Sequence, residues 1–370
     1  MPELCIIYNM AQHYRREIFM LIDKSFDCRF VFGKHPIGVT NIKSIPLSDF
    51  KNASYLENKV FLKAPFYWQK GVFRELSNGA RVYIMLGEPF CVSTWLFAFF
   101  AKFMRGKKLY FWTHGWYGDE GLAKRALKKI FFRLADGVFC YGNYARNLMI
   151  KEGFSEKRLF VIYNSLAYSE QVEIRKSLAE TPVYSEHFKN SNKNIIFIGR
   201  LGANKKLDMI IRALAELKKS GAFMNATFVG DGEERPRLER LAEELGVGEN
   251  VWFYGACYDE KENANLIYNA DICVSPGNVG LTAMHALVFG CPVITHNNFA
   301  MQMPEFEAVK EGETGAFFEY GSLESLVKTI RRWCGAPRGR EKIRQNCFAE
   351  IDAKWNPQNQ LEILKSSIGI

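Results

Sequence analysis

The feature that most constrains the fold is a series of short apolar runs, each of strand length, that alternate with helical stretches. The first half of the 370 residues has six of these runs, at 4–8, 28–32, 81–86, 108–112, 138–141 and 160–163. Continuous apolar runs of this length, separated by helices, are typical of parallel strands that are covered on both faces. The first half therefore predicts a doubly wound α/β domain.

The alternation restarts after a polar stretch at 168–193, and polar segments that contain proline are where domains part. Five more runs follow, at 194–198, 226–229, 251–253, 271–274 and 292–295. Helical spacing between the first two of them places these residues on one face: Leu207, Ile210, Ile211, Leu214 and Leu217. We therefore predict two Rossmann-like domains, 1–170 and 194–345, with a linker at 171–193. A C-terminal helix at 346–370 is expected to pack back toward the first domain.

The composition fits a globular protein with an anionic partner. Hydrophobic residues make up 48% of the chain, enough to bury two sheets, and the formal net charge is +9. Such an excess of cations favours phosphate groups, anionic lipid or nucleic acid. No stacking platform or recognition-helix motif accompanies the charge, which argues against nucleic acid.

The cysteines and the N-terminus indicate where the protein resides. Nine cysteines form no Cys-x-x-Cys pair, and isolated thiols of this kind are typical of a reducing compartment. The N-terminus lacks the basic flank of a signal peptide. The longest apolar run, 91–104, is shorter than the ~18 residues of a spanning helix. We therefore predict a cytoplasmic protein that fits a peripheral location at the inner face of the cell membrane.

Two glycine-containing turns in the second half predict anion sites. The run 194–198 leads into Gly199, Arg200 and Lys205, and open α/β sheets bind anions at the carboxyl ends of their strands. A second turn, at 278–282, opens a helix whose free N–H groups attract negative charge. Either turn alone is better explained as a solvated loop, but the two together favour a diphosphate. One fixed donor at a developing oxyanion is worth about 3 to 4 kcal/mol.

The order of motifs in the second half resembles glycosyltransferase family 4. The motifs are Phe-Ile-Gly-Arg-Leu at 197–201 with Lys205, Phe-Val-Gly-Asp-Gly at 228–232, Phe-Tyr-Gly at 253–255, Ala-Asp at 270–271, Gly-Cys-Pro-Val-Ile at 290–294, and the glycines and threonine of 312–315. The first half resembles the family more faintly, at 113–115 and 161–165. The resemblance implies a GT-B fold, in which two Rossmann-like domains face a central cleft. It also implies a nucleotide-sugar donor, no metal or other cofactor, and retention of anomeric configuration.

The resemblance also implies roles for individual residues. Arg200 and Lys205 would grip the diphosphate, and His114 would face the donor sugar from the other domain. The other donor contacts would come from the following residues: Gly199, Gly232, Gly255, Ala256, Cys257, Gly280, Leu281, Thr282 and His285.

The chain departs from the family at two positions. Members usually carry two glutamates eight positions apart, which contact the donor sugar and the ribose, and here these positions hold Gly277 and His285. A neutral imidazole can still bond to ribose, although a packed helix residue is an equally good interpretation of His285. Glu305 and Glu307 could supply the lost carboxylate or cap a helix. A degenerate subunit that binds nucleotide or a partner without turnover is therefore the alternative to an active enzyme.

The turn after the first apolar run carries polar side chains where many family members have glycines. It includes His13 and Arg15, which we expect near the acceptor or a phosphate, although a role at the helix start is equally compatible. A retaining reaction needs no enzymic base, because the departing phosphate oxygen can take the acceptor's proton. An inverting reaction would need a base, and the candidates are His13, His114, Asp119 and Glu120.

Two segments of the first half, 95–108 and 124–133, combine aromatic and basic residues and fit an anionic membrane surface. The buried core of a Rossmann helix is the alternative for the rings of the first segment. The resemblance to family 4 implies a hexosyltransferase-type enzyme that transfers sugar from a UDP- or GDP-type donor. It also implies a glycan or lipid-linked acceptor and a role in surface polysaccharide assembly.

Overall fold

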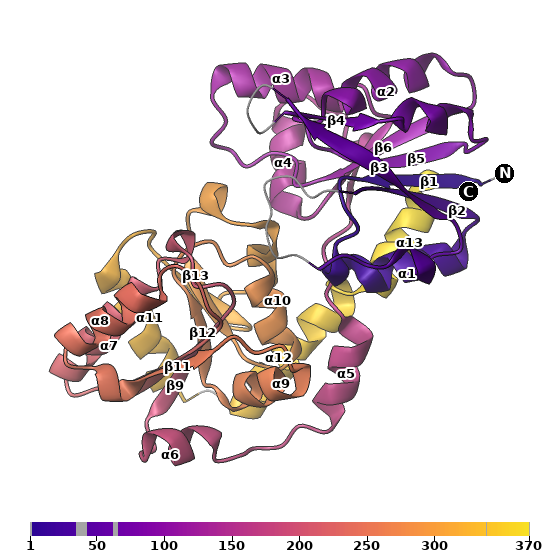
Figure 1. Ribbon diagram of the computed structural model, residues 1–370. Helices are drawn as coiled ribbons and strands as arrows, with labels where there is room; N and C mark the ends of the chain where they lie inside the picture. Colours follow the sequence, from indigo (N-terminus) through magenta and orange to yellow (C-terminus); the bar gives the residue numbers. More distant parts are fainter. Residues whose placement is uncertain (1, 35–42, 62–65, 338, 370) are drawn as a thin grey trace. The chain divides into compact units, whose positions relative to one another are not determined.

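The computed structural model describes residues 2–34, 43–61, 66–337 and 339–369, and the chain divides into two compact units (Figure 1). The first unit comprises Met1–Ala167 together with Asn356–Ile370, and the second comprises Tyr168–Trp355. Each unit has its own sheet.

The first unit is built on an eight-stranded sheet of order β4-β3-β2-β1-β5-β6-β7-β8. All neighbouring strands are parallel except β3 and β4, which are antiparallel. The strands are β1 Leu4–Tyr8, β2 Cys28–Gly33, β3 Ala53–Val60, β4 Tyr67–Lys70, β5 Val82–Leu86, β6 Lys108–Thr113, β7 Gly137–Cys140 and β8 Leu159–Val161. The direction of strand addition reverses between β1 and β5, so this position is the switch point of the sheet.

Helices cover both faces of this sheet, which explains why its central strands are apolar throughout. The helices are α1 Arg16–Ser25, α2 Val92–Phe103, α3 Leu122–Phe132, α4 Asn143–Lys151 and α13 Pro357–Ile368. In Figure 1, α2 and α3 lie on one side of the sheet, and α1 and α13 on the other. Alternate residues of β1 serve the two layers, since Ile6 packs with the α1 and α13 core and Ile7 with the α2 and α3 core.

The second unit has a six-stranded sheet of order β11-β10-β9-β12-β13-β14, and all of its strands are parallel. The strands are β9 Lys193–Ile198, β10 Met224–Val229, β11 Val251–Gly255, β12 Ile272–Ser275, β13 Val293–His296 and β14 Gly315–Phe318. The helices are α5 Tyr168–Lys176, α6 Val183–Phe188, α7 Asp208–Lys219, α8 Arg235–Glu244, α9 Glu260–Asn269, α10 Leu281–Val288, α11 Leu323–Gly335 and α12 Arg340–Lys354. The predicted pair of Rossmann-like domains is thereby confirmed.

All eleven predicted strand runs are strands, with ends within two residues of the prediction. The predicted crossover helix is α7, and its apolar stripe is buried. Three strands were missed. β3 is a largely exposed strand with polar residues, β4 is its short antiparallel partner, and β14 begins at a glycine, so none has the long apolar run of a central strand.

The predicted linker and C-terminal helix differ from the structure. Residues 168–193 contain α5 and α6 and belong to the second unit, where the Tyr184 hydroxyl donates to the Leu266 carbonyl at 2.7 Å. Residues 346–370 span two helices. Residues 346–354 are the end of α12, which belongs to the second unit. Helix α13 belongs to the first unit, where Ser165 Oγ donates to Gln360 Oε1 at 2.6 Å. Among the described helices, none combines the length and the hydropathy that crossing a bilayer requires.

Candidate active site

The candidate donor site lies at the switch point of the second sheet, between β9 and β12. Loops that leave two such strands lie side by side at the carboxyl edge, where open α/β sheets bind their ligands. The loop after β9 carries Gly199, Arg200 and Lys205, and the loop after β12 carries residues 276–280. The structure brings these two loops into contact, because the Gly277 N–H donates to the Lys205 carbonyl at 2.9 Å.

Lys205 is the best-placed cation of this site. Its Nζ donates to both the carbonyl and the Oδ1 of Asn278, each at 2.7 Å. Burial lowers the pKa of its ammonium to about 8, and the charge of Glu305 only partly opposes the effect. Lys205 is therefore still mostly protonated at neutral pH, but it lacks the full solvation that an ordinary surface lysine has. A phosphate would supply the missing negative charge.

Arg200 lies in a different environment. Its side chain is 67% exposed, and its Nη2 is 3.2 Å from Glu233 Oε2 in the neighbouring loop. An ion pair as exposed as this one stabilises little, because water screens it. An incoming phosphate can therefore compete with Glu233 for the guanidinium.

The start of α10 supplies N–H groups beside Lys205. Gly280 precedes the helix with φ 52° and ψ −147°, a conformation that side-chain-bearing residues avoid. The helix begins at Leu281, so the N–H groups of Leu281 and Thr282 have no partner within the helix. The Thr282 hydroxyl donates to the Ile198 carbonyl at 2.9 Å and ties α10 to the end of β9.

Gly277, one of the two departures from family 4, has a structural explanation. A Cβ atom at this position would lie 2.0 Å from the Asn204 carbonyl oxygen and 2.7 Å from the Lys205 Cα. A glutamate here would therefore displace the loop that positions Lys205. Gly277 thus permits close contact between the two backbone segments.

His285, the second departure, is paired with a carboxylate that the sequence analysis missed. Its Nε2 is 3.0 Å from Oε1 of Glu260, the first residue of α9, and Gln171 Nε2 donates to the same oxygen at 2.7 Å. Burial opposes ionisation of Glu260, but the bonds from His285 and Gln171 keep the pKa of its carboxyl below the ordinary value. A carboxylate thus lies beside the position where the family glutamate is absent. Glu260 and His285 are 25 positions apart and meet only in the folded chain, so no sequence pattern indicates the pair.

The remaining predicted donor residues lie along the same edge of the second sheet. A Cβ atom on Gly232 would be 2.4 Å from the Leu201 carbonyl, so this glycine permits close contact with the loop after β9. The Gly255 carbonyl accepts from the Gly230 N–H at 2.8 Å. Ala256 is exposed and Cys257 is half-buried in the loop after β11. Glu305 is buried, and Glu307 is half-buried, in the turn Pro304–Ala308.

The first unit has a cavity of about 320 Å³ at its own switch point, lined by residues that follow β1, β5, β6 and β7. Arg15 and His114 both line it. Burial, aided by the charges of Arg15 and Lys128, lowers the pKa of His114 to about 4, so its imidazole is neutral at physiological pH. His13 is exposed instead, and its N–H donates to the Lys43 carbonyl at 2.9 Å. The structure therefore brings Arg15 and His114 together without His13.

Of the two acidic candidates for a base, Glu120 is already fully engaged. Its Oε1 is 2.6 Å from Lys128 Nζ, and its two oxygens accept from the N–H groups of Tyr117 and Gly118, each at 2.9 Å. Burial alone would raise the pKa of Glu120, but these bonds keep the pKa below its ordinary value. The carboxylate therefore shapes the loop after β6. Asp119 beside it is exposed.

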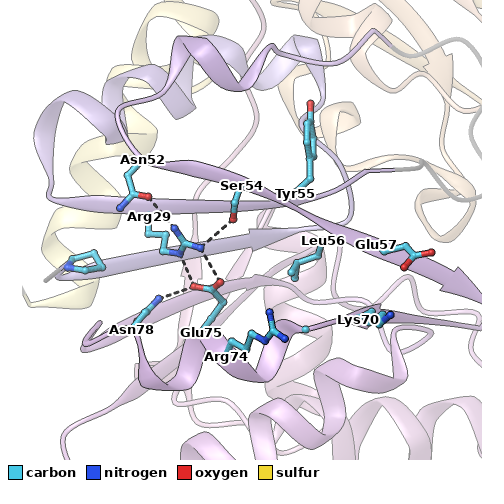
Figure 2. A pocket seen from close by; sticks show the side chains of 12 residues that line it. Arg29, Asn52, Ser54, Tyr55, Leu56, Glu57, Lys70, Arg74, Glu75 and Asn78 are labelled. Atoms are coloured by element: carbon cyan, nitrogen blue, oxygen red, sulfur yellow. Dashed lines mark hydrogen bonds and ion pairs between the residues drawn. The ribbon is translucent and has the colours of Figure 1, made fainter.

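A larger cavity of about 770 Å³ lies near Arg29 and Glu75 in the first unit (Figure 2). Figure 2 shows the Arg29 guanidinium pointing at the Glu75 carboxylate, with Nε 2.6 Å from Oε2. Arg29 also donates to Asn52 Oδ1 and Ser54 Oγ at 2.9 and 3.1 Å. Its central charges neutralise each other, and Arg29 lies near the amino end of β2, away from the loops that follow the strands. We therefore do not regard it as the active site.

The family match among the comparisons with known proteins lies within the second unit. Residues 184–349 match the family model described as glycosyl transferases group 1, and this segment contains every predicted donor residue of the second unit. The chain is 25% identical over 236 residues to an uncharacterized 41.2 kDa protein in the cps region of Klebsiella pneumoniae, covering 61% of each chain. It is 28% identical over 180 residues to the D-inositol 3-phosphate glycosyltransferase of Mycobacterium tuberculosis, covering 47% of this chain and 36% of that one. The chain thus spans less than two thirds of the length of these relatives.

Solved structures share the fold over the whole chain. The Anabaena protein HepE in complex with UDP matches with a TM-score of 0.74 and 16% identity over 100% of both chains. The lipopolysaccharide outer core galactosyltransferase WaaB, in its apo form, matches with a TM-score of 0.73 and 15% identity over 99% of both. At such identities the likeness extends to the fold alone. The group 1 match over residues 184–349 supports the prediction of a glycosyltransferase enzyme, and both that activity for the whole chain and membership of family 4 stay predictions.

Proposed function

We propose that the protein is a retaining glycosyltransferase of the family 4 type, which moves a sugar from a nucleoside-diphosphate sugar to a glycan or lipid-linked acceptor. The observation that carries this proposal is the partly dehydrated ammonium of Lys205, held beside the N–H groups that start α10. Departure of the nucleoside diphosphate leaves negative charge on its β-phosphate. Fixed donors at that position stabilise this charge as it develops.

The donor is proposed to be a UDP-sugar, and a GDP-sugar is the alternative donor to test against it. HepE, which shares the fold, has been solved with UDP and with UDP-glucose. The Glu260 carboxylate is proposed to meet the ribose hydroxyls, together with His285, since carboxylates commonly bind ribose in Rossmann-like sites. Arg200 would turn from Glu233 to the diphosphate.

The chemistry is proposed to need neither an enzymic base nor a metal. In a retaining transfer from the leaving-group face, the departing phosphate oxygen takes the acceptor's proton while the new glycosidic bond forms. Lys205 and the α10 N–H groups supply the positive charge that a divalent cation would otherwise provide.

The setting is proposed to be the cytoplasmic face of the cell membrane, in surface polysaccharide assembly. The outer faces of α2 and α3 expose large apolar side chains: Leu96, Phe99, Phe100, Phe103, Met104, Leu122, Leu127 and Ile130. Exposed cations alternate with them, including Lys102, Arg105, Lys124 and Arg125. Rings and cations together suit an anionic lipid surface. The buried-core alternative holds for Phe97 of α2, which is fully buried.

The proposal is tested by measuring thermal stability of the full chain with UDP, GDP and their sugars, followed by donor hydrolysis and transfer assays. A ligand that binds only the folded state raises stability by mass action. We expect UDP to raise the melting temperature, and both Lys205→Met and Arg200→Ala to lose most of this increase. An increase that both variants retain would contradict the site. Nucleotide binding without turnover on any donor would instead identify a degenerate subunit.

A further inference from the structure

Arg15 of the first unit is a buried cation with an aromatic enclosure. It is only 5% exposed and immediately precedes α1. Its guanidinium carbon lies 5.2 Å from the ring centres of Trp112 and Tyr141 and 5.4 Å from that of Tyr8. Its Nη2 donates to the Tyr141 hydroxyl, whereas Nε and Nη1 have no acceptor of good geometry among the described residues. Arg15 also lines the 320 Å³ cavity at the switch point.

The groups that act on the charge of Arg15 are the hydroxyls of Tyr8, Tyr14 and Tyr141, and among the described residues no carboxylate forms an ion pair with it. Lys128 lines the same cavity and shows the contrast, because its Nζ is 2.6 Å from Glu120 and 2.9 Å from the Gly115 carbonyl. A guanidinium cannot shed its proton in a protein, so Arg15 stays charged. Buried charges are normally paired, and aromatic faces compensate only part of the cost. The charge of Arg15 is therefore available to a ligand.

The rest of the cavity wall favours an anion. Lys124 adds a second cation, and His114 is neutral, so it can donate one hydrogen bond or accept one. Among the described lining residues, Glu88 is the one acidic side chain. Its carboxyl accepts from the Tyr67 hydroxyl at 2.8 Å, and burial raises its pKa. The wall thus carries little negative charge, and the carboxyl of Glu88 is bonded to Tyr67.

We propose that this cavity binds a compact oxyanion of the acceptor, either a phosphate or a carboxylate, on the guanidinium of Arg15. A guanidinium offers paired N–H groups that match both oxyanions. The aromatic walls suit the apolar face of a sugar ring, and a cavity of this size lies at the lower end of ligand sites. Naming the acceptor as carrier of the anion rests on the proposed function. The anion site itself rests only on the cavity and on Arg15.

The test compares probes that share one sugar ring and differ at C6. Galactose, galacturonate and galactose 6-phosphate, with inorganic phosphate as a probe without a ring, are titrated into the full chain. We expect at least one of the anions to bind about tenfold more tightly than galactose, which is 1.4 kcal/mol. Preference for galacturonate would indicate a uronic-acid acceptor, and preference for either phosphate would indicate a phosphate-bearing one. If no anion binds more tightly than galactose, the proposal is overturned.

Arg15→Met is the decisive variant, because methionine fills the space without charge. Replacing a buried charge by an apolar side chain is often neutral or stabilising, so the ligand-free variant should be at least as stable as the wild type. We expect it to lose the preference for anions, whereas Lys124→Met, which removes the exposed cation of the same wall, keeps most of it. Wild-type anion affinity in Arg15→Met would overturn the assignment.

Two further measurements keep the outcome unambiguous. Should Arg15→Met fail to fold, Arg15→Lys retains a charge without the paired N–H groups, and wild-type affinity in that variant would also overturn the proposal. The UDP-dependent rise in melting temperature should be unchanged in Arg15→Met, because UDP is assigned to the second unit. If UDP fails to bind the wild type but the anions bind through Arg15, the proposed function fails and the anion site stands.

Discussion

Lys205 should make protein stability depend on pH in the alkaline range. The ordinary pKa of lysine is 10.5, and in the folded protein burial lowers the pKa of Lys205 to about 8. Between these values the unfolded chain holds a proton that the folded chain has released. Unfolding free energy therefore rises with pH across this window, and below pH 8 the folded state carries the full cost of the buried charge. At 1.36 kcal/mol for each pH unit, the cost is about 3 kcal/mol.

The measurement is urea unfolding at several pH values between 7 and 10, for the wild type and for Lys205→Met. Other groups titrate in this range, so the quantity of interest is the difference between the two proteins. We expect the wild type to gain up to about 2 to 3 kcal/mol relative to the variant as the pH rises. Parallel stability curves would show that the Lys205 amine is as well solvated as a surface lysine, and the reasoning about a dehydrated cation would be wrong.

UDP binding supplies an independent check of the same group. A bound diphosphate raises the pKa of Lys205 again, because opposite charge favours the ammonium. UDP affinity should therefore decrease as the pH rises above 8, by up to about tenfold per pH unit. Lys205→Arg should not show this decrease, because its guanidinium stays protonated. A wild-type affinity that is constant from pH 7 to 10 would contradict direct contact between Lys205 and the diphosphate.

Three further changes test the surrounding site and surface. Gly277→Ala places a methyl group against the Lys205 loop. We expect urea unfolding to show a stability lower by about 1 to 3 kcal/mol, and we expect the variant to lose most UDP binding. Glu260→Gln removes the charge beside His285, and we expect the UDP dissociation constant, measured by calorimetry, to rise about tenfold as a charge-assisted bond is lost. Phe99→Ser with Phe103→Ser should weaken cosedimentation with phosphatidylglycerol vesicles at least about tenfold, since a buried ring contributes on the order of 2 kcal/mol.

Each of these changes has a matched control in the chain. Gly335→Ala adds a methyl group where no atom lies within 4 Å and should leave stability and UDP binding unchanged. Glu262→Gln, on the same helix as Glu260, should keep wild-type UDP affinity. The double serine variant should keep its UDP response, and wild-type binding to the vesicles would argue against α2 as a membrane contact. A stable Gly277→Ala protein with full UDP binding would show that the two loops can separate without consequence.

The strands and the meeting of the two candidate donor-site loops could be predicted because both depend on local sequence. Parallel strands are buried on both faces, so their apolar runs stand out, and each site loop follows such a run. β3 was missed for the opposite reason, since much of it is exposed and its sequence is polar. The stretch 168–193 reads as a linker because its helices α5 and α6 have few apolar residues, and their ends are fixed by contacts with α9 that only the folded chain reveals.

The chemical state of the site residues could not be predicted, because it depends on tertiary contacts. The low pKa of Lys205 follows from burial against Asn278, 73 residues away. The carboxylate of Glu260 meets His285 only because α9 and α10 approach each other. Arg15 was expected near an acceptor or a phosphate, but no pattern near it indicates that rings from β1, β6 and the loop after β7 enclose it.

The two proposed anion sites use different cations, and this difference would have a functional consequence. Lys205 is an amine whose charge depends on its surroundings, so in the proposed reaction the departure of a diphosphate would change its proton affinity. Arg15 keeps its charge whatever occupies the cavity, and its aromatic enclosure is fixed by the ends of three strands. The charge of the proposed donor site would therefore adjust to its occupant, as a site that must release its product requires. The charge of the proposed anion site in the first unit would stay constant, which suits the selection of one class of acceptor.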